Sequence, residues 1–174
     1  MMFQERFRLP ESLTQTHALD RIQKTLDIIG LKPVKQLKTP WGAFLTFNSS
    51  DSDQFHLSFF GYEYLELMRE VRTPKLLVIG AGNQLAWQVH QRRAEFWKVI
   101  NGPVGVKTSE TDAEPEYYRV LQSGDVNRIP VGTRHRLTGL EGWGVVAEMW
   151  LHTDTQNLSA EDDIRRINDF WGRK

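Results

Sequence analysis

A series of short apolar runs between Lys75 and His152 most constrains the fold of this 174-residue chain. Glycine, proline, aspartate and serine separate the runs, and these residues favour turns because they accommodate tight chain reversals. Many short strands with such turns are typical of a β-sandwich or a jelly roll. The sequence therefore predicts an all-β fold here. The predicted strands are residues 75–79, 87–90, 95–101, 117–121, 127–129 and 145–152.

Helices are expected before and after these strands in the sequence. Apolar residues at helical spacing predict an amphipathic helix within residues 10–30, which Gly30 would end. A second apolar stripe, preceded by Ser159 and Asp162 in a capping-box-like arrangement, predicts a C-terminal helix over residues 159–171.

The segment before the strands predicts three smaller elements. A polar run over residues 48–53 is typical of a solvated loop. Alternation of apolar and polar residues predicts a half-buried strand over residues 55–59, and apolar spacing predicts a short helix over residues 64–71.

The composition is typical of one globular domain, which we assign to residues 1–174. Its 22 basic residues balance its 22 acidic residues, which argues against a nucleic-acid or anionic-membrane partner. No stretch reaches the roughly 18 apolar residues of a membrane span, and the first residues lack the apolar part of a signal peptide. We therefore expect a cytoplasmic protein. A homodimer is also expected, because a small barrel with terminal helices has faces to bury.

The region around Gly124 to His135 resembles the second half of the cupin pattern. Gly124, Pro130, Gly132 and His135 stand at the required offsets, and Gly139 replaces the final asparagine. The resemblance implies a single cupin jelly-roll barrel, which we assign to residues 40–153.

The first half of the cupin pattern is met at His90, Glu95 and Gly102, with Arg92 where a second histidine is expected. In the cupin arrangement these ligands converge inside the barrel and leave an open metal position. Arginine stays protonated and does not bind cations. Gln88 lies two residues before His90, on the same strand face, and can replace the missing ligand.

The predicted metal ligands share nitrogen or oxygen donor atoms, as they must in a chain without cysteine. They are Gln88, His90, Glu95 and His135. Such a mixed set suits a divalent metal, zinc first, with manganese, iron or nickel as alternatives.

Three further blocks resemble the type II mannose-6-phosphate isomerase family. Residues 88–97 resemble its Gln-Tyr-His-His-His-Arg-Ser-Glu-His-Trp block, and residues 129–137 its Ile-Pro-Ala-Gly-x-x-His-Arg-Leu block. Residues 161–166 resemble its closing Glu-Asp-Asp-Ile-x-Arg segment. The resemblance runs from about Pro40 to Arg173, with an apparent insertion between residues 48 and 72.

That family resemblance implies aldose–ketose isomerisation of a sugar or sugar phosphate, in which a base moves a proton between C1 and C2 while a metal polarises the oxygens. Glu148 is the candidate base, because it alternates with other residues of a predicted strand, and Arg136 is assigned with it as catalytic. The candidate ligands for the sugar phosphate are Arg92, Arg134 and Lys98, with Arg173 in reserve.

Two other functions remain open at this point. Arg92 in a ligand position is consistent with a non-catalytic cupin that binds a sugar or a small anion. The same barrel also hosts other metal-dependent activities, such as epimerases and dioxygenases.

Overall fold

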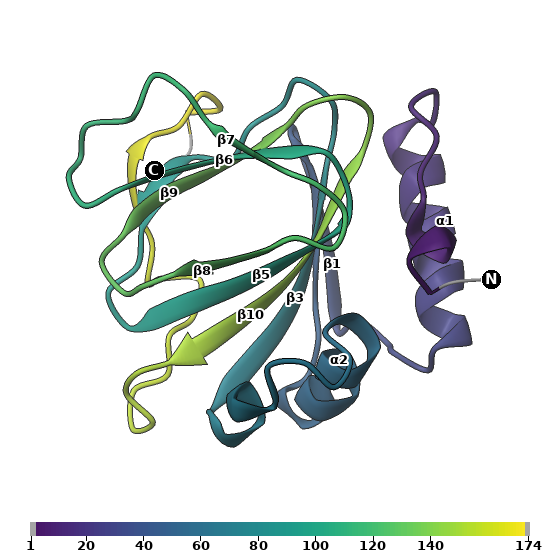
Figure 1. Cartoon of the computed structure of the whole chain (residues 1–174), viewed down its shortest axis with the longest axis horizontal. Coiled ribbons are helices and arrows are strands. Elements are labelled where there is room, and N and C mark those ends of the chain that lie inside the picture. The colour runs from purple at the N-terminus through teal and green to yellow at the C-terminus, as the bar shows by residue number, and fades with distance from the viewer. Residues whose placement is uncertain (1–2, 173–174) are drawn as a thin grey trace.

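The strands form two antiparallel sheets that face each other across a barrel interior (Figure 1), as shown by the computed structural model, which describes residues 3–172. The larger sheet contains, in spatial order, β1 (Lys35–Thr39), β2 (Gly42–Thr46), β3 (Arg72–Ile79), β10 (Gly144–His152), β5 (Arg93–Asn101) and β8 (Val126–Ile129). The smaller contains β11 (Arg165–Asn168), β4 (Trp87–Val89), β9 (Arg134–Gly139), β6 (Val104–Ser109) and β7 (Arg119–Leu121). This jelly-roll architecture confirms the predicted all-β fold.

Two helices cover the outer face of the larger sheet (Figure 1). Helix α1 (Gln15–Ile28) is the predicted N-terminal helix; the Thr14 hydroxyl caps it by accepting from His17 N, and Gly30 follows it at φ +75°. Helix α2 (Ser52–Phe59) lies between β2 and β3. Three short 3₁₀ turns accompany them: η1 (Phe3–Phe7), η2 (Ser49–Asp51) and η3 (Leu65–Arg69). Within residues 3–172 no helix has the length and apolar character needed to cross a membrane.

The strand predicted over residues 55–59 is wrong, because these residues belong to α2. Phe55 and Phe59 are four residues apart, so the same two side chains fit a helical as well as an alternating pattern. Both are buried, whereas Leu57 between them is 43% exposed. The polar run before them forms η2 and the start of α2, and the helix predicted over residues 64–71 is only the 3₁₀ turn η3.

The helix predicted over residues 159–171 is also wrong, because this segment contains β11, which pairs with β4. The Asp163 carboxylate accepts hydrogen bonds from the backbone N–H groups of Gln91 at 3.0 Å and Arg92 at 2.9 Å. These bonds bring the next residues alongside the open edge of β4, where an extended segment satisfies unpaired backbone groups. Long-range pairing thus overrides the helical spacing.

Strand alternation divides the apolar residues between two cores. On β5, Ala94 and Phe96 face the helices, whereas Trp97 and Val99 face the barrel interior. Glu95 shares the inward face, because side chains two apart on a strand point the same way. The interior therefore has an apolar part and a charged part.

Gly139 replaces the asparagine of the cupin pattern because the chain passes very close to another strand end. A Cβ atom at this position would lie 2.1 Å from the backbone oxygen of Gly80. We expect Gly139→Asn to lower the free energy of unfolding by about 2 kcal/mol or more, since the backbone itself must shift. Urea unfolding followed by tryptophan fluorescence measures this loss. Gly82→Asn is the control, because a Cβ at Gly82 meets nothing within 4 Å and asparagine tolerates the left-handed backbone at this position (φ +69°) better than most residues. Equal losses at both positions would contradict the explanation.

Candidate metal centre and pocket

The inward face of the larger sheet carries the charged residues of the interior in neighbouring rows. Glu148 on β10 lies opposite Lys75 on β3 and opposite Trp97 on β5. In the next row, Trp150 on β10 lies opposite Glu95 on β5. The register of three central strands therefore brings two carboxylates, an ammonium and two indoles to one end of the barrel.

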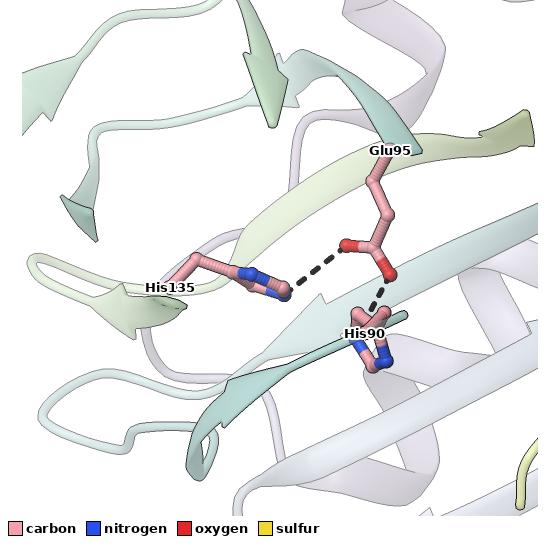
Figure 2. A group of neighbouring side chains, drawn as sticks. All are labelled: His90, Glu95 and His135. Carbon is pink, nitrogen blue, oxygen red and sulfur yellow. Dashed lines mark ion pairs between the residues drawn. The ribbon is translucent and has the colours of Figure 1, made fainter. Parts of the chain in front are cut away.

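Three of the predicted metal ligands converge there (Figure 2). His90 follows β4, Glu95 lies on β5 and His135 lies on β9. One potential ligand atom from each lies within 4.8 Å of the others. The Glu95 oxygens are 3.2 Å from His90 Nε2 and 3.3 Å from His135 Nε2, and all three side chains are buried.

Backbone carbonyls set the tautomers of both imidazoles. His90 Nδ1 donates to the Asp163 oxygen, and His135 Nδ1 donates to the Thr133 oxygen at 3.0 Å. Burial lowers the pKa of His90 to about 4, so this ring is neutral near pH 7. With Nδ1 engaged in this way, each ring directs its Nε2 atom toward Glu95, which is the arrangement found around protein-bound metals.

Glu95 supplies the negative charge of the cluster. Burial raises the pKa of Glu95, but the two histidines and the Arg93 guanidinium more than offset this effect, so its pKa lies well below the usual range. Among the described residues, Glu95 Oε2 has no hydrogen-bond donor. The two Nε2 atoms and the Glu95 carboxylate converge on one point, and imidazole nitrogens with a carboxylate oxygen are donors that divalent metals take in proteins. The donor set therefore fits a divalent metal.

Gln88 lies beside the two histidines. Its Nε2 atom is 3.4 Å from His90 Nε2 and 3.3 Å from His135 Nε2. Rotation of the amide by about 180° exchanges its nitrogen for its carbonyl oxygen, which is a metal ligand. Gln88 is thus placed where a fourth ligand is needed.

The role of Gln88 is tested by Gln88→Ala, which we expect to weaken metal binding by about tenfold. The alanine removes the amide oxygen and leaves the three other ligands in place. Isothermal titration of the chelator-treated protein with Zn²⁺ measures the affinity. Gln91→Ala, at an exposed position on the same segment, is the control, and an unchanged affinity in Gln88→Ala would remove Gln88 from the ligand set.

Arg93 is a cation of this site that our sequence analysis missed. Its guanidinium donates to Glu95 Oε1 at 2.9 Å and to His90 Nε2 at 3.1 Å, and it stacks on the Trp150 ring at 3.7 Å. The signal was present in the sequence, because Arg93 stands two residues before Glu95 and shares its strand face. Arg92, the residue singled out by the pattern, occupies the opposite face.

Glu148 is held by two indoles. Its Oε1 accepts from Trp97 Nε1 at 2.9 Å and its Oε2 accepts from Trp150 Nε1 at 2.9 Å. Burial, and then the charge of Glu95, raises the pKa of Glu148 to about 8. Glu148 is therefore both positioned and far more basic than an ordinary glutamate, as its predicted catalytic role requires.

A pocket opens beside these residues. Gln88, Glu95 and Glu148 line it, so it reaches the candidate metal centre. Its positively charged wall residues are Lys75, Arg93 and Arg166. None of these three was predicted to bind substrate.

The four cations predicted for substrate binding or catalysis lie away from this pocket. Because His135 faces inward, Arg134 and Arg136 point outward, where they pair with Asp112 and Glu114. Lys98 likewise alternates with the inward Trp97 and lies 3.7 Å from a Glu63 oxygen. Alternation along each strand thus separates these side chains from the metal ligands beside them.

Arg92 also points away from the pocket. It pairs with Asp162 at 2.8 Å and donates to the Asn157 side chain at 2.7 Å. Arg173, the reserve candidate, lies outside the described residues.

Comparison with known families gives a match over most of the chain. The family described as "Mannose-6-phosphate isomerase C-terminal" matches residues 49–169. The matched region includes the three clustered residues and Glu148.

Curated relatives are longer proteins. The chain is 25% identical over 163 residues to the xanthan biosynthesis protein XanB of Xanthomonas campestris, covering 88% of this chain and 29% of that protein. It is 27% identical over 99 residues to the alginate biosynthesis protein AlgA of Pseudomonas aeruginosa, covering 57% of this chain and 19% of that protein. It is 28% identical over 107 residues to a mannose-1-phosphate guanylyltransferase of Escherichia coli, covering 59% and 21%. The chain thus spans less than a third of each relative.

Solved structures share the fold. The capsular polysaccharide assembling protein CapF of Staphylococcus aureus has a TM-score of 0.55 at 13% identity, covering 95% of this chain and 45% of that one. Oxalate decarboxylase of Bacillus subtilis has a TM-score of 0.53 at 13% identity, covering 76% and 30%. At such identities these likenesses establish the cupin-like barrel alone.

Proposed function

Because the chain belongs to the mannose-6-phosphate isomerase C-terminal family, we propose that it is a metal-dependent isomerase of a sugar phosphate, which interconverts an aldose and a ketose. One observation carries this proposal: Glu95 of a buried His–Glu–His cluster lines the same pocket as Glu148, a glutamate of raised pKa. Metal-dependent aldose–ketose isomerisation uses these two parts, a metal at the oxygens and a base at the carbons.

His90, Glu95 and His135 would hold the metal, with Gln88 as the fourth ligand and zinc as the first candidate. When bound, a divalent metal polarises the substrate oxygens and makes the neighbouring C–H bond more acidic. Asp163 and Thr133 keep both imidazoles oriented through their Nδ1 atoms. These residues therefore define the end of the pocket at which C1 and C2 of the sugar would lie.

Glu148 would move the proton. In its ionised form a carboxylate oxygen takes the proton from one carbon, and the resulting acid returns it to the neighbouring carbon. Each oxygen accepts one indole hydrogen bond and retains a further lone pair for the proton. A pKa of about 8 makes the carboxylate a stronger base than an exposed glutamate, while part of the protein remains ionised near neutral pH.

The proposal is tested by metal analysis followed by proton exchange. Protein purified without chelators is first assayed for bound divalent metals. It is then incubated in D₂O with hexose, pentose and heptose phosphates, and NMR records deuterium uptake at C1 and C2. Stoichiometric metal and exchange with at least one sugar phosphate are expected. A metal-free protein, or the absence of exchange with every sugar, would contradict the isomerase.

A second candidate function is a non-catalytic cupin that binds a sugar or a small anion. The position of Arg93 favours it, because its guanidinium already donates to Glu95 and His90 and supplies a positive charge at the cluster. Such a protein would bind its ligand without metal and without exchange. The same two measurements therefore distinguish the two functions.

A further inference from the structure

Lys75 is a buried ammonium on strand β3. The four residues after it on β3 are apolar and buried. Its side chain points inward and is 9% exposed, with Nζ 4.2 Å from the centre of the Phe44 ring and 4.7 Å from that of Trp150. Two aromatic faces thus hold the charge at the pocket wall. A buried ammonium with this surrounding requires an anion.

The anion in this structure is Glu161, whose Oε1 lies 2.9 Å from Lys75 Nζ. Glu161 belongs to the segment between β10 and β11, and it lines the same pocket. The two partners differ greatly in exposure, since the Glu161 side chain is 51% exposed. Water can therefore solvate the Glu161 carboxylate when it leaves, whereas the buried Lys75 ammonium is shielded from water and still needs an anion. The pair is built so that the carboxylate can be replaced.

A second donor lines the pocket without an acceptor. Trp41 is 3% exposed, and its Nε1 atom has no hydrogen-bond partner among the described residues. Leaving a buried N–H unsatisfied costs free energy, and indole N–H groups usually find partners. Trp41 is stacked with Phe44, one of the two rings that hold Lys75. Lys75 and Trp41 are thus two donors that line the same pocket and pack against the same ring.

The space left by this arrangement is small, about 60 Å³, whereas sites for small molecules generally measure roughly 300 Å³ or more. A sugar phosphate can enter only if part of the lining moves. Glu161 is the exposed member of the lining on a segment without regular structure, so it is the group that can leave at the lowest cost.

From these observations we propose that Lys75 and Trp41 form the binding subsite for the phosphate group of the substrate, and that Glu161 occupies this subsite until the phosphate displaces it. The inference rests on the proposed function, because it assigns the anionic end of the same substrate. Arg166, which also lines the pocket, adds positive charge at the rim. Gln88, Glu95 and Glu148 line the remainder of the same pocket, where the carbons of the sugar would lie.

The test compares the affinities of mannose 6-phosphate, mannose and inorganic phosphate for three variants by isothermal titration. Lys75→Met should lose at least tenfold in affinity for mannose 6-phosphate and inorganic phosphate and keep its affinity for mannose. Glu161→Gln should bind both phosphates severalfold more tightly, because the internal competitor has lost its charge. Lys98→Met is the matched control, since this lysine points away from the pocket, and its affinities should equal those of the unmodified protein.

The Glu161→Gln variant keeps the proposal testable if Lys75→Met fails to fold, because Glu161 lies at the surface. An unchanged or weaker phosphate affinity in Glu161→Gln would overturn the subsite, and so would an unchanged affinity in a folded Lys75→Met. The proposed isomerase can fail independently of the subsite. If phosphate binding depends on Lys75 but no sugar phosphate exchanges its proton, the subsite is supported and the isomerase is rejected. If the exchange rate is the same in Lys75→Met and in the unmodified protein, the isomerase is supported and the subsite is rejected.

Discussion

Replacing His135 with alanine is expected to weaken metal binding by more than about 100-fold and to abolish isomerisation, because loss of a direct ligand exceeds the 10–100-fold cost of losing an outer partner. His135 reaches the cluster from β9, on the sheet opposite Glu95. Its loss leaves Gln88, His90 and Glu95, which belong to neighbouring segments and leave the β9 side of the ion open. Metal content after dialysis, measured by mass spectrometry, and the D₂O exchange rate both report the effect.

Arg134→Ala provides the control for this variant. Arg134 is the preceding residue on the same strand, but its side chain points outward to Asp112. The control should keep its metal and its exchange rate. Stoichiometric metal in a folded His135→Ala protein would contradict the assigned cluster.

Glu148→Gln is expected to slow isomerisation by about 10²- to 10⁴-fold while the metal stays bound, because the amide cannot accept the proton. The change keeps the side-chain shape, although the amide accepts from only one of the two indoles that Glu148 binds. Loss of the metal together with the activity would instead indicate a structural role for Glu148. The measurements are the exchange rate at saturating sugar phosphate and the metal content.

The same variant gives a pH signature that an ordinary exposed glutamate would lack. The pKa of Glu148 is about 8 in the folded, metal-free protein and near its ordinary value when unfolded. The protonated form therefore stabilises the fold fully below about pH 4.5, and this stabilisation is lost as pH rises toward 8. Between these values the wild type should lose about 1.4 kcal/mol per pH unit relative to Glu148→Gln. Urea unfolding in EDTA at several pH values measures this slope. The control is Glu116→Gln, at an exposed position, whose stability should change with pH as that of the wild type does.

The central part of the site could be predicted from the sequence because its determinants are local. His135 follows a turn whose Gly132 has φ +79°, and Glu95 stands at a fixed distance from His90 on the adjoining strand. Strand alternation then decides which side chains point inward. The same rule identifies Arg93 and excludes Arg134. The error about the cations came from choosing residues that are near the ligands in sequence rather than residues on the same strand face as the ligands.

The remainder of the pocket depends on contacts between distant segments, which local patterns do not report. Lys75 lies opposite Glu148 because of the register between β3 and β10. Glu161, which pairs with Lys75, is 86 residues further along the chain. The C-terminal strand was missed for a related reason. Its apolar spacing fits a helix, and only the open edge of β4 and the hydrogen bonds of Asp163 make the extended form favourable.

The four-residue strand β11 and the residues just before it therefore have an influence out of proportion to their size. Asp163 orients the His90 ring through its backbone oxygen, and Glu161, two residues earlier, closes the pocket over Lys75. Edge strands of this length open more readily than the centre of a sheet, often without global unfolding. Local opening of this strand would release the ring of one ligand and the cover of the pocket in a single event, so the exchange rate of the metal and the entry rate of the substrate would share one barrier.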